Sequence, residues 1–247
     1  MASTREILGT LDSWLQPGNF QDYCPNGLQV EGKAAVSTLV TGVTASQALI
    51  DAAIEAGADM ILVHHGYFWK GEDARIQGMK RARLKRLLDN DINLVAYHLP
   101  LDDHPEYGNN RRLADVLGLV RPRPLNGLVW EGELPEPLSP EQFGLAIARA
   151  LHREPLHVGG GPQQIRRVGW CTGAAQGYIQ TALEAGLDAY ISGEISESTT
   201  HTARECGIHY YAAGHHATER YGVQALGDAL ARQFGLRHTF IDCDNPV

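Results

Sequence analysis

Short apolar runs alternate with segments of helical spacing along the first 120 residues of the chain. VSTLVTGVT (36–44), DMILVHH (59–65) and INLVAYHLPLD (92–102) are rich in apolar and β-branched residues, which is typical of buried strands. We expect Pro100 to end the third of these strands. Apolar residues with helical spacing fill ASQALIDAAIEAG (45–57), between the first two strands. Because strands that alternate with helices favour parallel pairing with crossover connections, the pattern predicts an α/β fold.

The middle of the chain has a different pattern. RPRPLNGLVWEGELPEPLSP (121–140) is rich in proline and turn residues, and it is compatible with a short hairpin. Further helices are expected from the spacing of apolar residues in four segments, at 1–16, 76–91, 109–119 and 141–151.

The first pattern then returns. TGVTASQALIDAAIEAGADMILVHH (41–65) resembles TGAAQGYIQTALEAGLDAYISGE (172–194), since both contain TG, an apolar helix, EAG, one residue, Asp and an apolar strand. We predict two related α/β halves with mainly parallel strands, residues 1–120 and 121–247. The proline-rich connection at 121–165 is too short for an inserted domain. Chance similarity of two ordinary βα units is the alternative.

Polar side chains that can bind metals collect where the predicted strands end. The carboxyl ends of parallel strands form one edge of a sheet, and that edge is where sites of α/β proteins form. The sequence therefore predicts a site at the strand ends between the halves, built from the following residues: His64, His65, His98 and Asp102 from the first half, and Ser192, Gly193, Glu194, His215, His216 and Glu219 from the second.

Five of these residues make a mixed nitrogen and oxygen ligand set. His64 and His65 are adjacent at a strand end, where the chain turns and both rings can reach one pocket. His215 and Glu219 lie four apart, which is one turn of a helix. With Asp102 they form a set that suits Zn, Fe or Mn, and that is too rich in nitrogen for a dedicated Mg or Ca site. The alternatives are ordinary hydrogen-bonded histidines, a turn cap at Asp102, and a carboxylate at Glu219 placed by the helix dipole.

Composition and charge narrow the class of protein. The net charge of −8 argues against a protein whose main role is to neutralise phosphate backbones. One basic cluster at 80–86 is more typical of a solvated helix face. No run approaches the length of a membrane span, the N-terminal segment lacks the apolar core of a signal peptide, and no cysteine pair has CxxC spacing. We therefore expect a cytoplasmic protein without a membrane partner.

The order of several segments gives a specific resemblance over essentially the whole chain. The chain resembles the Nif-three-like dinuclear metal-centre family, whose members are labelled GTP cyclohydrolase I type 2 homologues, and within it the short bacterial YbgI-type branch. The segments that carry the resemblance are PNGLQVEG, VTGVTAS, ILVHHGYFWKG, HLPLD, SGE and AAGHHATER.

The resemblance implies a ligand assignment and an assembly. His65 and Asp102 would bind one metal ion, His64 and His215 the other, and Glu219 would bridge the two. Family members of this type form toroidal homohexamers with the metal sites facing the interior of the ring, so we expect this chain to have itself as a partner.

Two function classes follow from a dinuclear site. The first is a metal-dependent hydrolase, because a pair of metal ions can activate water; the family label alone points to a nucleotide or modified nucleotide as its small-molecule substrate. His98 and Glu194 are then the candidates for catalytic proton transfer or for orienting the ligands, and Tyr67 and Lys70 could contact substrate, with packing as the alternative for all four. The second class is a non-catalytic scaffold that stores or delivers metal, or a ring that engages another macromolecule. The net acidity argues against nucleic acid as that macromolecule.

Overall fold

The computed structural model describes residues 1–247, and the chain divides into two compact units. Unit 1 contains Met1–Tyr107 and Gly222–Asp244, and unit 2 contains Gly108–Tyr221 and Asn245–Val247. This division differs from contiguous halves at 1–120 and 121–247. The chain returns to unit 1 near its end because its last strand, Arg237–Phe240, pairs in parallel with Thr38–Thr44 and extends the first sheet.

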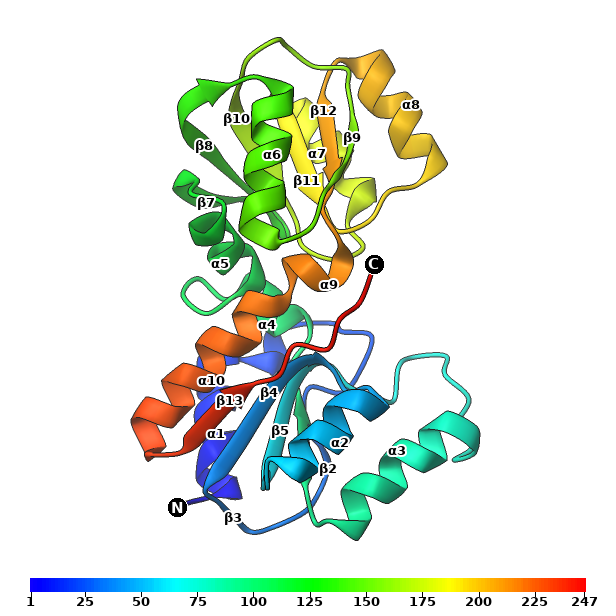
Figure 1. Ribbon diagram of the computed structural model, residues 1–247, viewed down its shortest axis with the longest axis vertical. Coiled ribbons are helices and arrows are strands. Elements are labelled where there is room, and N and C mark those ends of the chain that lie inside the picture. The colour runs from blue at the N-terminus through cyan, green and yellow to red at the C-terminus, as the bar shows by residue number, and fades with distance from the viewer. The chain divides into compact units, whose positions relative to one another are not determined.

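Unit 1 is a five-stranded sheet with helices on both faces (Figure 1). The strand order is β13-β4-β5-β6-β2, and only β2 is antiparallel to its neighbour. Its elements are β1 (Ala2–Ser3), α1 (Thr4–Leu15), η1 (Pro17–Asn19), β2 (Gly27–Val30), β3 (Ala35–Val36), β4 (Thr38–Thr44), α2 (Gln47–Glu55), β5 (Met60–His65), α3 (Gly78–Asp89), β6 (Asn93–Ala96), α4 (Leu99–Asp103), α10 (Arg220–Phe234, in unit 1 from Gly222) and β13 (Arg237–Phe240).

Successive residues of the buried strands of unit 1 pack against different helices. Leu62 of β5 belongs to a cluster with apolar residues of α1 and α10. Ile61 and Val63, its two neighbours, belong to a second cluster with residues of α2 and α3. Because side chains alternate between the faces of a strand, a continuous apolar run such as MILV is what a sheet covered on both faces requires.

Unit 2 is a six-stranded mixed sheet in the order β7-β8-β10-β11-β12-β9. The strands β10, β11 and β12 are parallel, and β7, β8 and β9 run antiparallel to their neighbours. Its elements are α5 (Asn109–Val116), β7 (Val120–Asn126), β8 (Val129–Leu138), α6 (Pro140–Leu151), β9 (Leu156–Val158), β10 (Ile165–Trp170), η2 (Gln176–Tyr178), α7 (Ile179–Glu184), β11 (Ala189–Ser192), α8 (Glu197–Cys206), β12 (His209–Ala212) and α9 (His215–Thr218).

Two apolar clusters also cover the sheet of unit 2. One combines α5 and α6 with residues such as Trp170 and Ile191, and the other combines α7 and α8 with residues such as Tyr190 and Tyr210. Tyr190 and Ile191 are neighbours on β11 and belong to different clusters, as the alternation along a strand requires. The mixed α/β class predicted from the sequence is confirmed in both units, with parallel strands at the centre of each sheet.

The repeated segments occupy matching positions in the two sheets. In unit 1, β4, β5 and β6 are parallel and β2 pairs antiparallel with the third; in unit 2, β10, β11 and β12 are parallel and β9 does the same. The aspartate of the EAG-x-D segment has the same role in both. Asp59 Oδ2 accepts hydrogen bonds from the backbone N–H groups of Ser37 and Thr38, and Asp188 Oδ2 accepts them from Arg166 and Arg167. The sequence repeat therefore marks a repeated strand–helix–strand unit, held by the same carboxylate-to-backbone contact.

Two local expectations can be compared with the structure directly. The predicted hairpin at 121–140 is present, with β7 and β8 joined by a two-residue turn in which Gly127 has a φ of +56°. The predicted strand at 92–102 is wrong in its second half. It ends at Ala96, and Pro100 lies in the first turn of the short helix α4, where a missing N–H is tolerated. No helix in the chain is both long and apolar enough to cross a membrane.

Candidate metal centre

The end of β5 and the short helix α4 bring four candidate residues of unit 1 together. His64 is the last residue but one of strand β5 and is fully buried, and His65, the last residue, is partly exposed. Their ring centroids are 4.5 Å apart, and the ring of His98 lies 5.1 Å from that of His64 and 5.8 Å from that of His65. Asp102 of α4 has one carboxylate oxygen 3.5 Å from His64 Nε2. We call these four residues the unit 1 cluster.

The hydrogen bond of His64 determines which of its nitrogens can bind a metal ion. Nδ1 lies 3.0 Å from the backbone carbonyl of Tyr97, and a carbonyl can only accept. Nδ1 therefore carries the proton, and Nε2 presents its lone pair on the side of Asp102. A metal-binding histidine is typically fixed in this way, with its second nitrogen bound to a carbonyl or carboxylate.

A loop that precedes β2 fixes the imidazole of His98. Its Nδ1 lies 2.6 Å from Asp22 Oδ1, and its backbone N–H donates to Asn26 Oδ1. Asp22 Oδ2 also accepts from Asn26 Nδ2 and from the backbone N–H of Leu99. Burial of Asp22 raises its pKa, but the hydrogen bonds and the charge interaction with His98 and Asn26 outweigh this and lower the pKa to about 2. Asp22 is thus an ionised carboxylate at neutral pH and orients His98.

The PNGLQ segment also fixes the turn that follows the two histidines. Gln29 Oε1 accepts from the backbone N–H of Tyr67, and its Nε2 donates to the carbonyl of the same residue. Gly66 is required between them, because a Cβ there would lie 2.1 Å from Gln29 Oε1. The conformation of the turn after His64 and His65 therefore depends on a segment nearly 40 residues earlier in the chain.

Unit 2 places a second group of candidates at the end of β12. The chain passes through Gly214, with a φ of +99°, and enters the short helix α9 at His215. His215 Nε2 lies 3.2 Å from Glu219 Oε2, one helical turn along, as the spacing predicts. Its Nδ1 lies 2.8 Å from Glu194 Oε1, which follows β11. We call Glu194, His215 and Glu219 the unit 2 cluster.

Gly173 allows the carboxylate of Glu219 to approach the backbone. Gly173 belongs to the repeated TG pair and has a φ of +69°. A Cβ at this position would lie 2.2 Å from Glu219 Oε1 and 3.1 Å from His215 Nε2. The backbone around it is tightly bonded, since its N–H donates to Thr218 Oγ1 and its carbonyl accepts from Ser192 Oγ. The sequence singled out Ser192 at a strand end, and its role in the structure is this support.

The unit 2 cluster is rich in negative charge. Burial lowers the pKa of His215, but the hydrogen bonds and charges of Glu219 and then of Glu194 outweigh it and raise the pKa to about 9. The two carboxylates beside the imidazole thus stabilise a positive charge at this position. That charge can be a proton on the imidazole or a bound metal cation.

The remaining predicted contacts are mostly accounted for by local packing. Tyr67 is buried and its hydroxyl donates to the carbonyl of Ala45, so its polar group is used inside the fold. Lys70 is exposed.

Three other histidines lie outside both clusters. The rings of His157 and His209 are hydrogen-bonded to each other, and the ring nitrogens of His238 lie within hydrogen-bonding distance of Asp228 and Thr41. These histidines have ordinary hydrogen-bonding roles.

The basic cluster on α3 is a solvated helix face rather than an unpaired patch. Lys85 and Arg86 are exposed, and each forms an ion pair, as does Lys80; the acidic partners are Asp89, Asp51 and Glu72 respectively.

Each cluster has donors that suit a divalent transition-metal ion. In unit 1, donor atoms of His64, His65 and His98 all lie within 4.8 Å of one another. In unit 2, His215 and Glu219 present nitrogen and oxygen at 3.2 Å. Imidazole with carboxylate is the donor set that Zn, Fe and Mn accept. The residues present therefore fit the metal sites that the sequence predicts, and Asp22 is the functional-looking residue that the sequence did not reveal.

Comparison with known proteins extends over the whole chain. The family model described as Duf34/NIF3 (NGG1p interacting factor 3) matches residues 2–246. A curated relative from Pseudomonas aeruginosa, named GTP cyclohydrolase 1 type 2 homolog, is 60% identical over 241 residues, which is 96% of this chain and 95% of the relative. A relative of the same name from Vibrio cholerae is 56% identical and covers 98% of each chain.

A solved structure titled protein ybgI, of unknown function, superposes with a TM-score of 0.97 at 52% identity, with 100% of both chains covered. The resemblance seen in the sequence segments is confirmed, and the chain belongs to the Duf34/NIF3 family.

Proposed function

We propose that the chain binds two divalent metal ions and is a hydrolase that acts on a nucleotide or a modified nucleotide. The ligands are His64, His65, Asp102, His215 and Glu219, and the ions are drawn from Zn, Fe and Mn. The observation that carries the proposal is the unit 1 cluster, in which three imidazoles and a carboxylate converge where β5 ends and where the chain leaves β6 for α4, with Nε2 of His64 presented on the side of Asp102.

The distribution of ligands follows the family resemblance. His65 and Asp102 would bind one ion, His64 and His215 would bind the other, and Glu219 would be a ligand of both. Asp102 and Glu219 supply the negative charge that two neighbouring cations require, because cation repulsion is strong in a poorly solvated site. When bound, the pair of ions supplies Lewis acidity and a nucleophile from water at neutral pH.

His98 is the residue placed to move a proton in this proposal. Asp22 holds its Nδ1 at 2.6 Å and, as the ionised partner, fixes the tautomer with the proton on Nδ1. Nε2 is then the atom that accepts a proton from a nucleophile or returns it to a leaving group. Glu194 has a supporting role, because its contact with Nδ1 of His215 orients that imidazole.

The nucleotide part of the proposal has the support of the relatives' name. The curated relatives at 52–60% identity are named GTP cyclohydrolase 1 type 2 homolog, and this chain covers 95–98% of their length. The name indicates a ring-opening hydrolysis of a nucleotide base as the first reaction to test.

A substrate screen with a matched pair of variants tests the proposal. The protein is loaded in turn with Zn, Fe or Mn and assayed against nucleotides, phosphoesters and cyclic amides. We expect turnover that disappears in His64→Ala and persists in His201→Ala, since His201 is an exposed residue of α8 outside both clusters. Metal bound at two ions per chain with no turnover on any panel would favour the alternative of a metal-binding scaffold.

We also propose that the chain forms a homo-oligomer, with a hexamer as the expected state from the family resemblance. The exposed ring of Phe68, in the turn after the two histidines, is an apolar group suited to a subunit interface. Light scattering at micromolar concentration should give a mass near six times 27.0 kDa. A monomer under these conditions would overturn the assembly without affecting the metal-binding proposal.

A further inference from the structure

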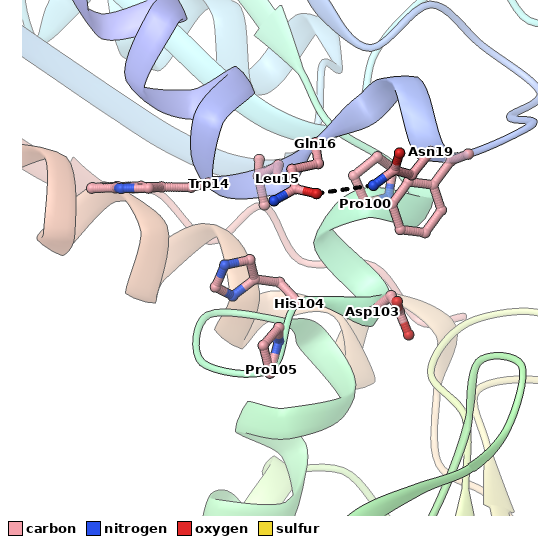
Figure 2. A pocket seen from close by; sticks show the side chains of 9 residues that line it. Trp14, Leu15, Gln16, Asn19, Pro100, Asp103, His104 and Pro105 are labelled. Atoms are coloured by element: carbon pink, nitrogen blue, oxygen red, sulfur yellow. Dashed lines mark hydrogen bonds between the residues drawn. The ribbon is translucent and has the colours of Figure 1, made fainter.

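Unit 2 contains a pocket whose charge is opposite to the net charge of −8 of the chain. It lies on the neighbouring strands β7, β8 and β10, and its volume is about 270 Å³. The charged residues that line it are Arg121, Arg123, Glu131, Glu133 and Arg167. A pocket of unit 1, between the end of α1 with η1 and the short helix α4, contrasts with it, because no Lys or Arg lines that pocket and its carboxylate is Asp103 (Figure 2).

Irregular backbone on both sides of β8 accompanies the gathering of these arginines. Glu131 and Glu133 lie two residues apart on β8, so their side chains point to the same face of the sheet. The pairing register shifts on each side of β8, once across 120–123 of β7 and once across 165–167 of β10. Arg121 lies in the first shift and has a φ of +53°, which residues other than glycine rarely adopt. Such shifts re-aim side chains, and they are frequent next to binding sites.

Two arginines share the carboxylate of Glu131. Arg123 Nε donates to Glu131 Oε1 at 2.8 Å, and Arg167 Nη2 lies 3.3 Å from Glu131 Oε2. The side chain of Glu131 is only 8% exposed, and a carboxylate that is so far removed from water requires charged partners of this kind.

Two further arginines share the carboxylate of Glu133. Arg121 Nη1 lies 3.0 Å from Glu133 Oε1, and Arg166 Nε lies 3.4 Å from Glu133 Oε2. Four guanidinium charges therefore surround two carboxylate charges, which leaves a net charge of +2 at this face. On α3, by contrast, each basic residue of the ion pairs has an acidic partner of its own.

The guanidinium groups are the accessible part of the pocket. The side chains of Arg121 and Arg123 are 74% and 72% exposed, far more than the glutamates beneath them. A guanidinium group has five N–H donors, and Arg121 uses one of them on Glu133. An anion can therefore receive donors from several arginines while the carboxylates keep their own contacts.

The position of β7 favours a small ligand over a docked peptide strand. β7 is an edge strand of its sheet, and Pro122 and Pro124 remove two backbone N–H groups from it. Prolines of this kind protect an edge from pairing with a further strand. The arginine side chains are then the groups of this edge that are suited to bind a ligand.

We propose that this pocket binds a dianion of the phosphate type, either free or as the end group of a monoester. A dianion balances the excess charge of +2, and the oxygens of a phosphate group match the parallel N–H donors of a guanidinium group. No aromatic side chain lines the pocket, so the anionic group itself is what is recognised. The inference goes beyond the proposed hydrolysis, since the site consists of residues of unit 2 alone and includes none of the candidate metal ligands.

Calorimetric titration of the full-length, metal-free protein with inorganic phosphate tests the proposal, at a pH where phosphate carries two negative charges. We expect binding at millimolar concentration that weakens as sodium chloride is added, because salt screens exposed charges. Nitrate, a planar anion with a single charge, should bind at least tenfold more weakly. Measurement without metal ions separates this result from the proposed function, since a failure of hydrolysis would leave phosphate binding unchanged.

Glycerol 3-phosphate distinguishes the two sources of the anion. Tighter binding than that of inorganic phosphate would identify a monoester as the ligand, whose organic part adds contacts at the mouth of the pocket. Equal or weaker binding would identify the free anion.

Two variants and a matched control decide whether the arginines of this pocket hold the anion. Arg121→Gln removes one guanidinium group and should weaken phosphate binding at least fivefold. Glu133→Gln removes a carboxylate that competes with the anion for Arg121 and Arg166, so phosphate should bind at least twofold more tightly. Arg75→Gln is the control, because Arg75 of unit 1 is 76% exposed and is paired with an aspartate, and it should leave phosphate binding unchanged.

Three results would overturn the proposal. The first is the absence of phosphate binding to the wild-type protein at millimolar concentration. The second is equal affinity of Arg121→Gln and Arg75→Gln for phosphate. The third is weaker binding by Glu133→Gln than by the wild type, since the carboxylate would then support the ligand and not compete with it.

Discussion

The repeated part of each unit has three parallel strands, β4, β5 and β6 in unit 1 and β10, β11 and β12 in unit 2. In each unit the third of these strands is followed by a short helix, but the side chains at the strand ends differ. The unit 1 cluster has three imidazoles and one carboxylate, with His64 fully buried. The unit 2 cluster has one imidazole between two carboxylates, with a glycine packed against one of them. The repeat therefore preserves the backbone that positions a site, while the donor atoms have diverged.

The conserved parts of the comparison are backbone contacts. Asp59 and Asp188 each accept hydrogen bonds from two successive backbone N–H groups at the start of the first repeated strand of their unit. The side chains that differ between the two units are the possible metal ligands at the strand ends. In the function proposed above, a nitrogen-rich end and an oxygen-rich end would together supply the mixed donor set that two transition-metal ions prefer.

The largest expected effect on this comparison comes from Gly173→Ala. The new Cβ would lie 2.2 Å from Glu219 Oε1, and the backbone has a φ of +69° that residues other than glycine rarely adopt. We expect a loss of about 2–4 kcal/mol in the free energy of unfolding, from backbone strain and overpacking together. Urea denaturation measures it.

Gly177→Ala is the matched control for that variant. A Cβ at Gly177 meets nothing within 4 Å, and no positive φ is present there. It should change stability by less than about 0.5 kcal/mol, as surface substitutions usually do. Equal stability of the two variants would show that the approach of Glu219 to Gly173 is not a constraint on unit 2.

An intermediate effect is expected when the repeated aspartate is removed from either unit. Asp59→Ala and Asp188→Ala each leave two backbone N–H groups without their carboxylate, which should cost about 1–3 kcal/mol in the free energy of unfolding. Thermal or chemical denaturation of the two variants provides the comparison. A loss in only one of them would mean that the two contacts, though similar in geometry, do not have the same structural role.

The smallest effect concerns the pH dependence of metal binding at the unit 2 cluster. His215, with its pKa raised to about 9, is protonated at neutral pH in the metal-free protein and must lose that proton to bind an ion. Metal affinity should therefore rise about tenfold per pH unit between pH 7 and pH 8 and level off above pH 9. Because the folded pKa is raised, the stability that the proton contributes is complete below pH 6.5 and is lost as the pH rises through 9.

Glu194→Gln sharpens this prediction. It removes one of the two carboxylates that raise the pKa of His215, so the affinity should level off at a lower pH than in the wild type. Metal titrations of both proteins between pH 6 and pH 10 measure the shift. Affinities that are flat from pH 7 to pH 9 in the wild type would contradict the raised pKa.

Much of this fold could be predicted from local patterns in the sequence. The apolar runs of β4 and β5 and the helical spacing of α2 gave the correct class, because a sheet covered on both faces produces such runs. The extent of the third strand could not be predicted in the same way. Tyr97 continues the apolar run of β6 in sequence, but β6 ends at Ala96 and the chain enters α4 after His98.

Sequence patterns could predict only those site residues that are adjacent in the chain or separated by one helical turn. Two HH pairs and the four-residue spacing of His215 and Glu219 indicated a metal site from the sequence. The role of Asp22 did not show, since its contact with His98 spans 76 residues and no local pattern marks it. Asn26 lies in a segment that carried the family resemblance, yet only the structure shows that it holds His98 in place.

Metal content tests the central claim, a dinuclear centre to which both clusters contribute, most directly. Elemental analysis should find two ions per wild-type chain and about one in His64→Ala, which removes a ligand from one ion only. If Glu219 binds both ions as proposed, Glu219→Gln would take an oxygen ligand from each ion and the negative charge from between them, so the content should fall below one ion per chain. Two full equivalents retained in Glu219→Gln would contradict the bridging role, and a wild-type protein without bound metal would contradict the dinuclear centre itself.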